Sequence, residues 1–343
     1  MVIVAAEKEG RLGKVEREAD RVDPLGIPMV PRVCPVCGSK QRKILFEDVN
    51  RREGLDFRSA YWRCKECKMI YLHPAPDWAQ FRRLYEEIFH EFEMDRVQLA
   101  DVRPIEPLQG SPPPGFKSSH WLRQVFPHPR LTPIEMSPDG RLSVLDVGCG
   151  TGSGLKPFYW SGWSVTGIDI NPLALEICRK AMPKGRFIHQ DFMEWTASNE
   201  SFDVVRTDNC LEHIPEPKDT LAKIASLLRP DGHVYIFVPN GASILFRLFR
   251  RYHVSSWIPF HLSLFTPSAM KRLCKDVGLE IERLQTYQPH TWLKMSLQQL
   301  SMKRGFYGSS KTESFLPESA WKALAELICL SGQADELIVW AYR

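Results

Sequence analysis

The stretch Leu142-Ser-Val-Leu-Asp-Val-Gly-Cys-Gly-Thr-Gly-Ser-Gly154 decides the fold of this chain. It predicts a short apolar strand that contains Asp146 and runs into a glycine-rich loop. The apolar run from Val144 to Val147 suits a strand that is buried on both faces of a parallel sheet. Glycines let the backbone of such a loop turn tightly and approach a ligand. The stretch therefore predicts a cofactor at the carboxyl end of this strand.

The spacing of the glycines narrows the class of cofactor. A dinucleotide site has the pattern Gly-x-Gly-x-x-Gly, in which the third glycine opens a helix under a pyrophosphate, but position 153 is Ser. Val-Leu-Asp followed by Gly148, Gly150 and Gly152 instead resembles motif I of the class I S-adenosylmethionine (SAM) dependent methyltransferases. The resemblance implies that this loop wraps the methionine part of SAM and that Asp146 accepts a hydrogen bond from its ammonium group.

Further segments fall where that family places its strands, and the resemblance covers about residues 140–343. Asn171 and Pro172 predict the N-cap and first position of a helix that continues through Ala181. Strands alternating with helices predict an α/β fold, with a Rossmann-like seven-stranded methyltransferase sheet whose last strand is antiparallel by resemblance. The expected strands are 144–147, 164–170, 186–192, 202–208, 232–240, 279–285 and 336–343.

The rest of the cofactor site follows from the same resemblance. Asp169 ends the second strand, nineteen residues after Gly150, where an acidic side chain accepts hydrogen bonds from both ribose hydroxyls. Asp191 and Phe192 correspond to the residues that hydrogen-bond to adenine and stack on it. Ile170 and Asn209 complete the predicted cofactor-binding set.

Two histidines are candidates for a catalytic base. His261 lies in an insertion at about 241–267, which the resemblance places over the cofactor pocket as a lid. Its context, His-x-x-x-Phe-Thr-Pro, resembles a recurring element of small-molecule methyltransferases, and imidazole can remove the proton of an acceptor hydroxyl. The alternative is a histidine that caps the helix after Thr266 or fixes the lid. His213 is the second candidate.

A catalytic cation is a further alternative at His213. In quinone-biosynthetic relatives, a Glu-x-x-Glu-His arrangement in this loop can hold a divalent cation, but the first position here is Asn209. This difference disfavours a metal site, although Asp208 is an adjacent oxygen ligand. Otherwise Glu212 and His213 line the acceptor cleft.

A second motif precedes the methyltransferase-like region. Cys34, Cys37, Cys64 and Cys67 form a Cys-x2-Cys-x26-Cys-x2-Cys pattern, which predicts a structural Zn²⁺ site with four thiolate ligands. The long gap can hold a β-hairpin. Free buried thiols or an iron cluster are the alternatives. This part resembles the zinc ribbon of bacterial methyltransferases associated with polysaccharide or secondary-metabolite assembly, and the five remaining dispersed cysteines indicate a reducing compartment.

The sequence predicts four consecutive parts. They are a flexible N-terminal tail (1–30), a zinc ribbon (31–75), a helical or irregular linker with a helix near 121–126 (76–140), and a methyltransferase domain (141–343). The first six residues are too short for a signal sequence, so we expect a cytoplasmic protein without a transmembrane segment. Arginines among apolar residues at 244–260 leave peripheral membrane contact as an alternative. Nothing in the sequence indicates an oligomeric state.

These patterns predict a SAM-dependent methyltransferase that acts on a small-molecule or glycan-type acceptor. Because the sulfonium activates the methyl group, catalysis should consist of in-line alignment and deprotonation of a hydroxyl. A net charge of +4 does not demand nucleic acid. One alternative is nevertheless an rRNA or tRNA methyltransferase that grips RNA with basic and aromatic residues of the ribbon. Another is a non-catalytic scaffold, which the intact Asp146 and Asp169 disfavour.

Overall fold

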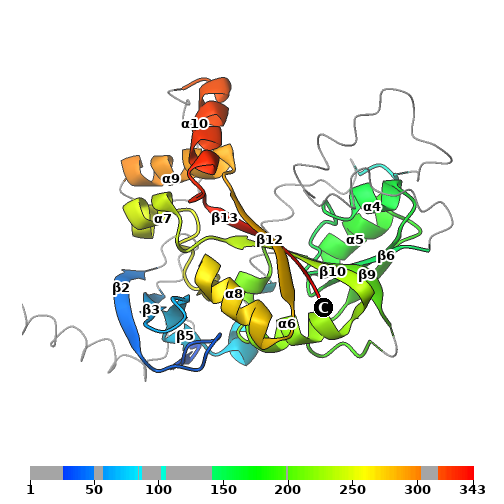
Figure 1. Ribbon diagram of the computed structural model, residues 1–343, viewed down its shortest axis with the longest axis horizontal. Helices are drawn as coiled ribbons and strands as arrows, with labels where there is room; N and C mark the ends of the chain where they lie inside the picture. The colour runs from blue at the N-terminus through cyan, green and yellow to red at the C-terminus, as the bar shows by residue number, and fades with distance from the viewer. Residues whose placement is uncertain are drawn as a thin grey trace, which may run out of the picture.

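The computed structural model describes residues 26–49, 57–83, 85–86, 102–105, 141–197, 200–302 and 316–343. Its largest element is a seven-stranded sheet with the strand order β12-β13-β10-β9-β6-β7-β8 (Figure 1). This confirms the predicted α/β fold. The strands are β6 (Ser143–Val147), β7 (Ser164–Asp169), β8 (Arg186–His189), β9 (Phe202–Asp208), β10 (Leu228–Pro239), β12 (Glu280–Tyr287) and β13 (Glu336–Tyr342).

The order of the strands places a crevice beside β6. Strands β7 and β8 follow on one side of β6, and β9 and β10 follow on the other, all parallel to it. Strand β13 is antiparallel to both of its neighbours, which confirms the expected direction of the last strand. Ligands of open α/β sheets bind where the strand order reverses, at the carboxyl ends. That place is the end of β6, where the glycine-rich loop begins.

Helices cover both faces of this sheet because its central strand β6 is buried on both sides. Helices α4 (Lys156–Trp160) and α5 (Pro172–Ala181) share a core with Val144, whereas α6 (Pro217–Ser226) and α8 (Pro267–Asp276) share another core with Leu145. The start of α5 is as predicted, because the side chain of Asn171 accepts hydrogen bonds from the backbone N–H groups of Leu173 and Ala174.

A smaller sheet lies beside the large one, and its strand β3 ends at Cys64 of the cysteine motif. Its order is β11-β4-β3-β2, all antiparallel pairs. The bounds are β2 (Arg42–Val49), β3 (Arg58–Cys64), β4 (Ile70–His73) and β11 (Ser263–Leu264). Pairing of β2 with β3 confirms the predicted hairpin. Strand β11 comes from the segment 241–267, so the predicted ribbon and the predicted lid share one sheet.

The remaining elements surround these two sheets (Figure 1). A short pair, β1 (Met29–Val30) and β5 (Ala75–Pro76), begins at the end of the segment expected as a tail. The others are the 3₁₀ helices η4 (Leu211–His213) and η5 (Arg250–Tyr252) and the helices α7 (Ile244–Phe249), α9 (His290–Met302) and α10 (Glu318–Leu330). Residues 78–83 and 85–86 are also helical.

Two expectations bear on the rest of the chain. The helix expected near 121–126, like most of the expected linker, lies outside the described residues. Within the described ranges, every helix is too short or too polar to cross a membrane.

Candidate active site

A cavity of about 1030 Å³ opens at the carboxyl ends of β6, β7 and β9. This is large enough for a cofactor together with a second small molecule, because single ligands occupy pockets of roughly 300–1,000 Å³. The structure brings most of the predicted site residues to its wall. Those that line it are Asp146, Gly148, Gly150, Asp169, Ile170, Asp191, Phe192, Asn209, His213 and His261.

The glycines of the loop differ in the space around the position of their Cβ atom. Gly148 has a φ of 71°, and a Cβ atom there would lie 2.3 Å from Sγ of Cys210. Gly150 has a φ of 48°, and no described atom lies within 4 Å of the place of its Cβ, so its backbone is open. Gly152 is not in the cavity wall, because it faces α5, where a Cβ would lie 2.7 Å from Sγ of Cys178. The loop thus forms a concave backbone surface, and side chains at these positions would fill the space that it leaves.

Asp169 is held in place by the backbone around it. Its Oδ2 accepts a hydrogen bond from the N–H of Gly150 at 2.8 Å, and its Oδ1 accepts one from the N–H of Asn171 at 2.9 Å. A carboxylate oxygen has more than one lone pair, so both oxygens can accept further hydrogen bonds from a ligand. This geometry suits a vicinal pair of hydroxyl groups such as those of ribose.

The residues expected around adenine and beside it are also fixed. Asp191 accepts a hydrogen bond from the N–H of Met193 at 2.8 Å and forms an ion pair with Arg82 at 3.3 Å. Phe192 lines the cavity, and Nζ of Lys223 lies 4.8 Å from its ring centroid. Asn209, with a φ of 50°, donates from its side chain to Asp208 at 3.1 Å.

Arg206 of β9 is a cavity residue that the sequence reasoning missed. Its Nη1 donates to Oδ2 of Asp146 at 2.9 Å and its Nη2 donates to Oδ2 of Asp208 at 2.5 Å. Oδ1 of Asp146 is buried and has no hydrogen-bond partner in the described part of the chain. Burial raises the pKa of Asp146 to about 7, although Arg206 opposes this shift. The signal in the sequence was an arginine within the otherwise apolar centre of 202–208.

The two candidate bases lie together on the other side of the cavity. The rings of His213 and His261 have centroids 4.8 Å apart. Nδ1 of His213 is 3.0 Å from the carbonyl oxygen of Phe260, and Nδ1 of His261 is 2.8 Å from that of Ser255. Because a carbonyl oxygen can only accept, Nδ1 carries the proton and donates it in each of these bonds, which leaves the lone pair of a neutral imidazole at Nε2. Burial lowers the pKa of His213 to about 4, so this ring is neutral near pH 7.

Glu212 completes a group that can bind a cation. One ligand atom each of Glu212, His213 and His261 lies within 4.8 Å of the others. Both carboxyl oxygens of Glu212 are buried without a hydrogen-bond partner among the described residues, and burial raises its pKa to about 8. Two imidazoles and a carboxylate are donors that suit Zn²⁺ or Fe²⁺. Asp208, the additional ligand considered from the sequence, is bound to Arg206 instead.

Aromatic side chains surround the histidines. The ring centroid of Trp257 lies 5.5 Å from that of His261, and the ring of Tyr85 lies 5.6 Å from that of His213. Both side chains line the cavity, as do Trp78 and Trp292. Such walls favour a ligand with a flat apolar face. No pattern in the sequence would group these four residues, which come from three separate segments.

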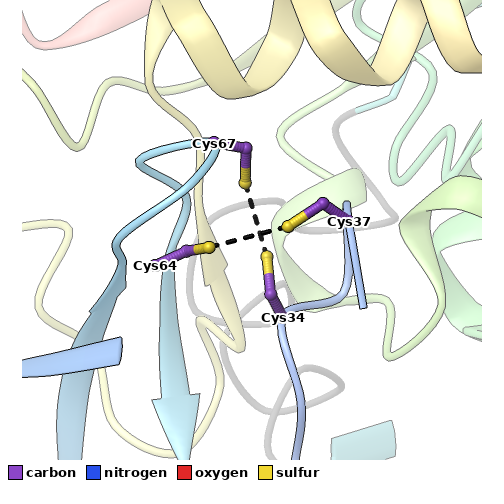
Figure 2. Close-up of side chains that lie close together, drawn as sticks. All are labelled: Cys34, Cys37, Cys64 and Cys67. Atoms are coloured by element: carbon purple, nitrogen blue, oxygen red, sulfur yellow. Dashed lines mark hydrogen bonds between the residues drawn. The ribbon is translucent and has the colours of Figure 1, made fainter. Parts of the chain in front are cut away.

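The four cysteines of the ribbon motif converge as predicted. Figure 2 shows their side chains pointing toward a common centre from two knuckles. The Sγ atoms of Cys34 and Cys67 are 3.4 Å apart, and those of Cys37 and Cys64 are 3.6 Å apart. With Zn–S bonds of about 2.3 Å, a tetrahedral site has sulfur atoms somewhat under 4 Å apart. The donor set and spacing therefore fit a closed thiolate site.

Comparisons with known proteins indicate the family of this chain. A family model described as a methyltransferase domain matches residues 119–284. The ubiquinone biosynthesis O-methyltransferase of Aromatoleum aromaticum is 32% identical over 166 residues, which are 43% of this chain and 69% of that protein. The enzyme of the same name from Idiomarina loihiensis is 31% identical over 200 residues, which are 54% of this chain and 81% of that protein.

Solved structures of similar fold include a SAM-dependent methyltransferase from Archaeoglobus fulgidus. It is 20% identical with a TM-score of 0.42, over 62% of this chain and 90% of that chain. The [4+2]-cyclase SpnF is 17% identical with a TM-score of 0.48, over 79% of this chain and 98% of that chain.

The chain belongs to the SAM-dependent methyltransferases. It is therefore an enzyme whose methyl donor is SAM, as predicted from the glycine-rich loop. The open backbone at Gly150 and the partnerless Oδ1 of buried Asp146 fit that cofactor.

Proposed function

We propose that this enzyme methylates a hydroxyl oxygen of a small molecule that carries a flat ring. The observation that carries the proposal is the pair His213 and His261, which faces the same cavity as the glycine-rich loop and is flanked by Trp257 and Tyr85. The names of the relatives, which are O-methyltransferases of ubiquinone biosynthesis, support oxygen as the acceptor atom.

In this proposal, the residues from the carboxyl ends of β6, β7 and β9 hold SAM. Asp169 accepts from the ribose hydroxyls, Asp191 and Phe192 contact adenine, and Ile170 and Asn209 border the adenosyl group. Gly148, Gly150 and Gly152 shape the loop over the methionine part. When bound, SAM supplies a methyl group already activated by its sulfonium, for in-line transfer.

His261 is the proposed base. It is 7% exposed, and its Nδ1 bond to Ser255 directs the basic Nε2 away from that carbonyl. His213 has a pKa near 4, so it is a weak proton acceptor and suits a role in orienting the acceptor. Removal of the hydroxyl proton by His261 would make the oxygen nucleophilic as the methyl group approaches.

The cavity wall supports the proposed acceptor class. Tyr85, Trp257 and Trp292 give it flat apolar faces, and these suit an aromatic ring. The apolar face of a sugar ring also packs on aromatic side chains, so a glycan-type acceptor belongs to the same proposal and is separated from it by experiment.

We further infer that Cys34, Cys37, Cys64 and Cys67 bind a structural Zn²⁺. The four thiols form a closed set with no place for a substrate ligand, which is the mark of a structural site. The ribbon at 31–75, the segment 76–140 and the methyltransferase domain at 141–343 stay as the proposed division of the chain.

The test uses purified enzyme and SAM labelled in its methyl group. The acceptors are hydroxylated aromatic compounds, nucleotide sugars and total RNA in separate reactions, and the control is Asp169→Ala, which should bind SAM poorly. We expect label in an aromatic product whose new group is an O-methyl ether by mass spectrometry. Label in a sugar would select the glycan-type acceptor. Label in RNA would overturn the proposal and indicate that the ribbon binds nucleic acid.

A further inference from the structure

Two ionisable side chains, His253 and Asp335, are buried together close to the cavity. Both are 0% exposed, and neither is among the described residues that line the cavity, although the next residue, Val254, is. Nε2 of His253 lies 3.0 Å from Oδ1 of Asp335. Buried pairs of this kind commonly add little stability compared with well-packed apolar side chains. Packing alone therefore gives no reason for a histidine and an aspartate here.

The large sheet holds the carboxyl group of this pair. Asp335 directly precedes β13 and Gln288 directly follows β12, at the end where these two strands are paired. The side chain of Gln288 donates to Oδ2 of Asp335 at 2.7 Å, and its Oε1 accepts from the N–H of Asp335 at 3.2 Å. The oxygen that faces His253 is thereby fixed to the framework of the sheet.

The hydrogen bonds of His253 determine which of its ring nitrogens carries the proton. Its Nδ1 accepts a hydrogen bond from the N–H of Ser255 at 3.1 Å. A ring nitrogen that accepts has no proton, so the proton of the neutral imidazole is on Nε2, beside Asp335. The carboxyl group therefore favours the form of His253 that can accept from Ser255.

The backbone of Ser255 connects this buried pair to His261. Its N–H donates to His253, and its carbonyl oxygen accepts from Nδ1 of His261 at 2.8 Å. The preceding residue is held as well, because the N–H of Val254 donates to Oγ of Ser296 at 3.1 Å. Ser255 can therefore transmit the position of His253 to the ring of His261.

We propose that His253 and Asp335 are positioning residues, which hold the carbonyl group of Ser255 where it fixes the ring of His261. The bond to this carbonyl keeps the proton of His261 on Nδ1 and leaves Nε2 as the proton acceptor. A base for an acceptor hydroxyl needs this form of the ring. The inference rests on the proposed function, in which His261 is the base.

Nitrogen NMR of the enzyme with isotope-labelled histidines tests the arrangement without any acceptor. The chemical shifts of the two ring nitrogens report which of them carries the proton. At about pH 8, above the usual histidine pKa of about 6.5, we expect the proton on Nδ1 in His261 and on Nε2 in His253. The variants His261→Asn and His253→Asn assign the two sets of signals. The opposite form in either histidine would overturn the inference.

Two substitutions of His253 separate its two bonds. His253→Asn keeps an acceptor for the N–H of Ser255, because asparagine readily accepts from the N–H two residues on. His253→Gln keeps an N–H donor for Asp335 but places no acceptor at Ser255. We expect the Gln variant to show both proton forms of His261 and a roughly 10- to 100-fold lower turnover at unchanged SAM affinity. The Asn variant should retain the wild-type form of His261 and most of the turnover.

The control is His233→Gln. This histidine also lies beside a carboxyl group, that of Glu282 at 3.5 Å, but it is outside the described cavity wall. The control should leave the signals of His261 and the turnover unchanged. Equal effects of His253→Asn and His253→Gln on His261 would overturn the inference, because the bond to Ser255 would then not be the connection. If the variants do not fold, the wild-type spectrum still decides.

Failure of the proposed function has a different signature. In that case His253→Gln would change the proton form of His261 while turnover stayed at the wild-type level. This result would support the orienting role of His253 and Asp335 and would count against His261 as the base.

Discussion

The carboxyl group of Asp146 connects binding of the methyl donor to pH. Burial raises the pKa of this group to about 7, so the ligand-free enzyme takes up a proton here as the pH falls below neutrality. The resemblance to motif I implies that the ammonium group of the ligand lies at Asp146, where it would favour the charged carboxylate, so binding would release that proton. We expect affinity for S-adenosylhomocysteine to rise by up to tenfold per pH unit from pH 5 and to level off near pH 7.

Titration calorimetry between pH 5 and 7.5 measures this dependence. Methylthioadenosine, which has no amino-acid end, is the matched ligand and should bind without it. Asp146→Asn should bind S-adenosylhomocysteine weakly at every pH. The same dependence of affinity on pH for both ligands would mean that the titrating group is another residue of the cavity.

The proposed role of His261 as the base can be tested apart from a role in fixing the predicted lid. We expect His261→Ala to lower turnover on the order of 10²–10⁴-fold while SAM affinity stays near that of the wild type. His261→Asn retains a donor for the Ser255 carbonyl, which is 2.8 Å from Nδ1, but cannot take up a proton. Steady-state kinetics and calorimetry measure both variants, with His233→Ala outside the cavity as the control.

The two variants separate a role as base from a role in fixing the lid, because only His261→Asn keeps a donor for the carbonyl of Ser255. If His261 is the base, Asn is as inactive as Ala. Recovery of turnover in His261→Asn would show instead that this residue fixes the lid.

At the scale of elements, helix α5 depends on its N-cap. Oδ1 of Asn171 accepts from the N–H groups of Leu173 at 3.0 Å and Ala174 at 3.2 Å. Asn171→Ala removes both bonds and should lower the free energy of unfolding by about 1 kcal/mol. Urea unfolding measures the change. Asn171→Ser, which keeps a capping oxygen, should lose much less, and an equal loss in both variants would contradict the capping role.

Most strands of the large sheet were predictable because they contain short apolar runs between polar breaks. β6 is buried over all five residues, as its sequence indicated, and the glycines after it predicted the position of the cavity. Boundaries were less exact, because pairing with neighbours sets them. β10 begins at Leu228 rather than Gly232, since Leu228 pairs with Phe202 before a shift in register.

Contacts between elements were not predictable to the same degree. Position 154 needs a glycine only because the guanidinium of Arg206, 52 residues later in β9, occupies the space of a Cβ atom there. Strand β11 is two residues long and exists only because β4 is there to pair with it. The aromatic wall gathers residues from three segments in the same way. The hydrophobic periodicity of a single segment does not predict these contacts, because the contacts arise from the tertiary arrangement.

On the scale of the whole molecule, the ribbon and the catalytic part are one packed unit. Met69 and Tyr71 belong to the same apolar core as Phe265 and Met270. The backbone continues the connection, because Leu72 donates its N–H to the carbonyl of Leu262 at 3.0 Å. Ser268 of α8 donates to the carbonyl of Cys67 at 2.9 Å. The proposed metal site therefore supports the segment that carries His261.

Loss of the metal should consequently impair catalysis as well as folding. We expect Cys37→Ser to lower the metal content, the melting temperature and turnover together, because structural Zn²⁺ sites contribute directly to folding. Elemental analysis, thermal unfolding and kinetics measure these three quantities. Cys329→Ser lies outside the cluster and should keep its metal. Full turnover in a metal-free Cys37→Ser protein would show that the metal site in the ribbon does not support the active site.

Tyr61 offers a finer test of the same connection, since it joins the predicted ribbon to the proposed base and is not part of the cysteine cluster. Its hydroxyl donates to the carbonyl oxygen of His261 at 2.9 Å from the buried centre of β3. Tyr61→Phe removes this bond and keeps the ring, so metal content and SAM affinity should stay unchanged. Loss of one buried hydrogen bond is worth about 1 kcal/mol, and we expect turnover to fall by several-fold as the lid loosens. Unchanged turnover would mean that the ribbon stabilises the fold but does not position His261.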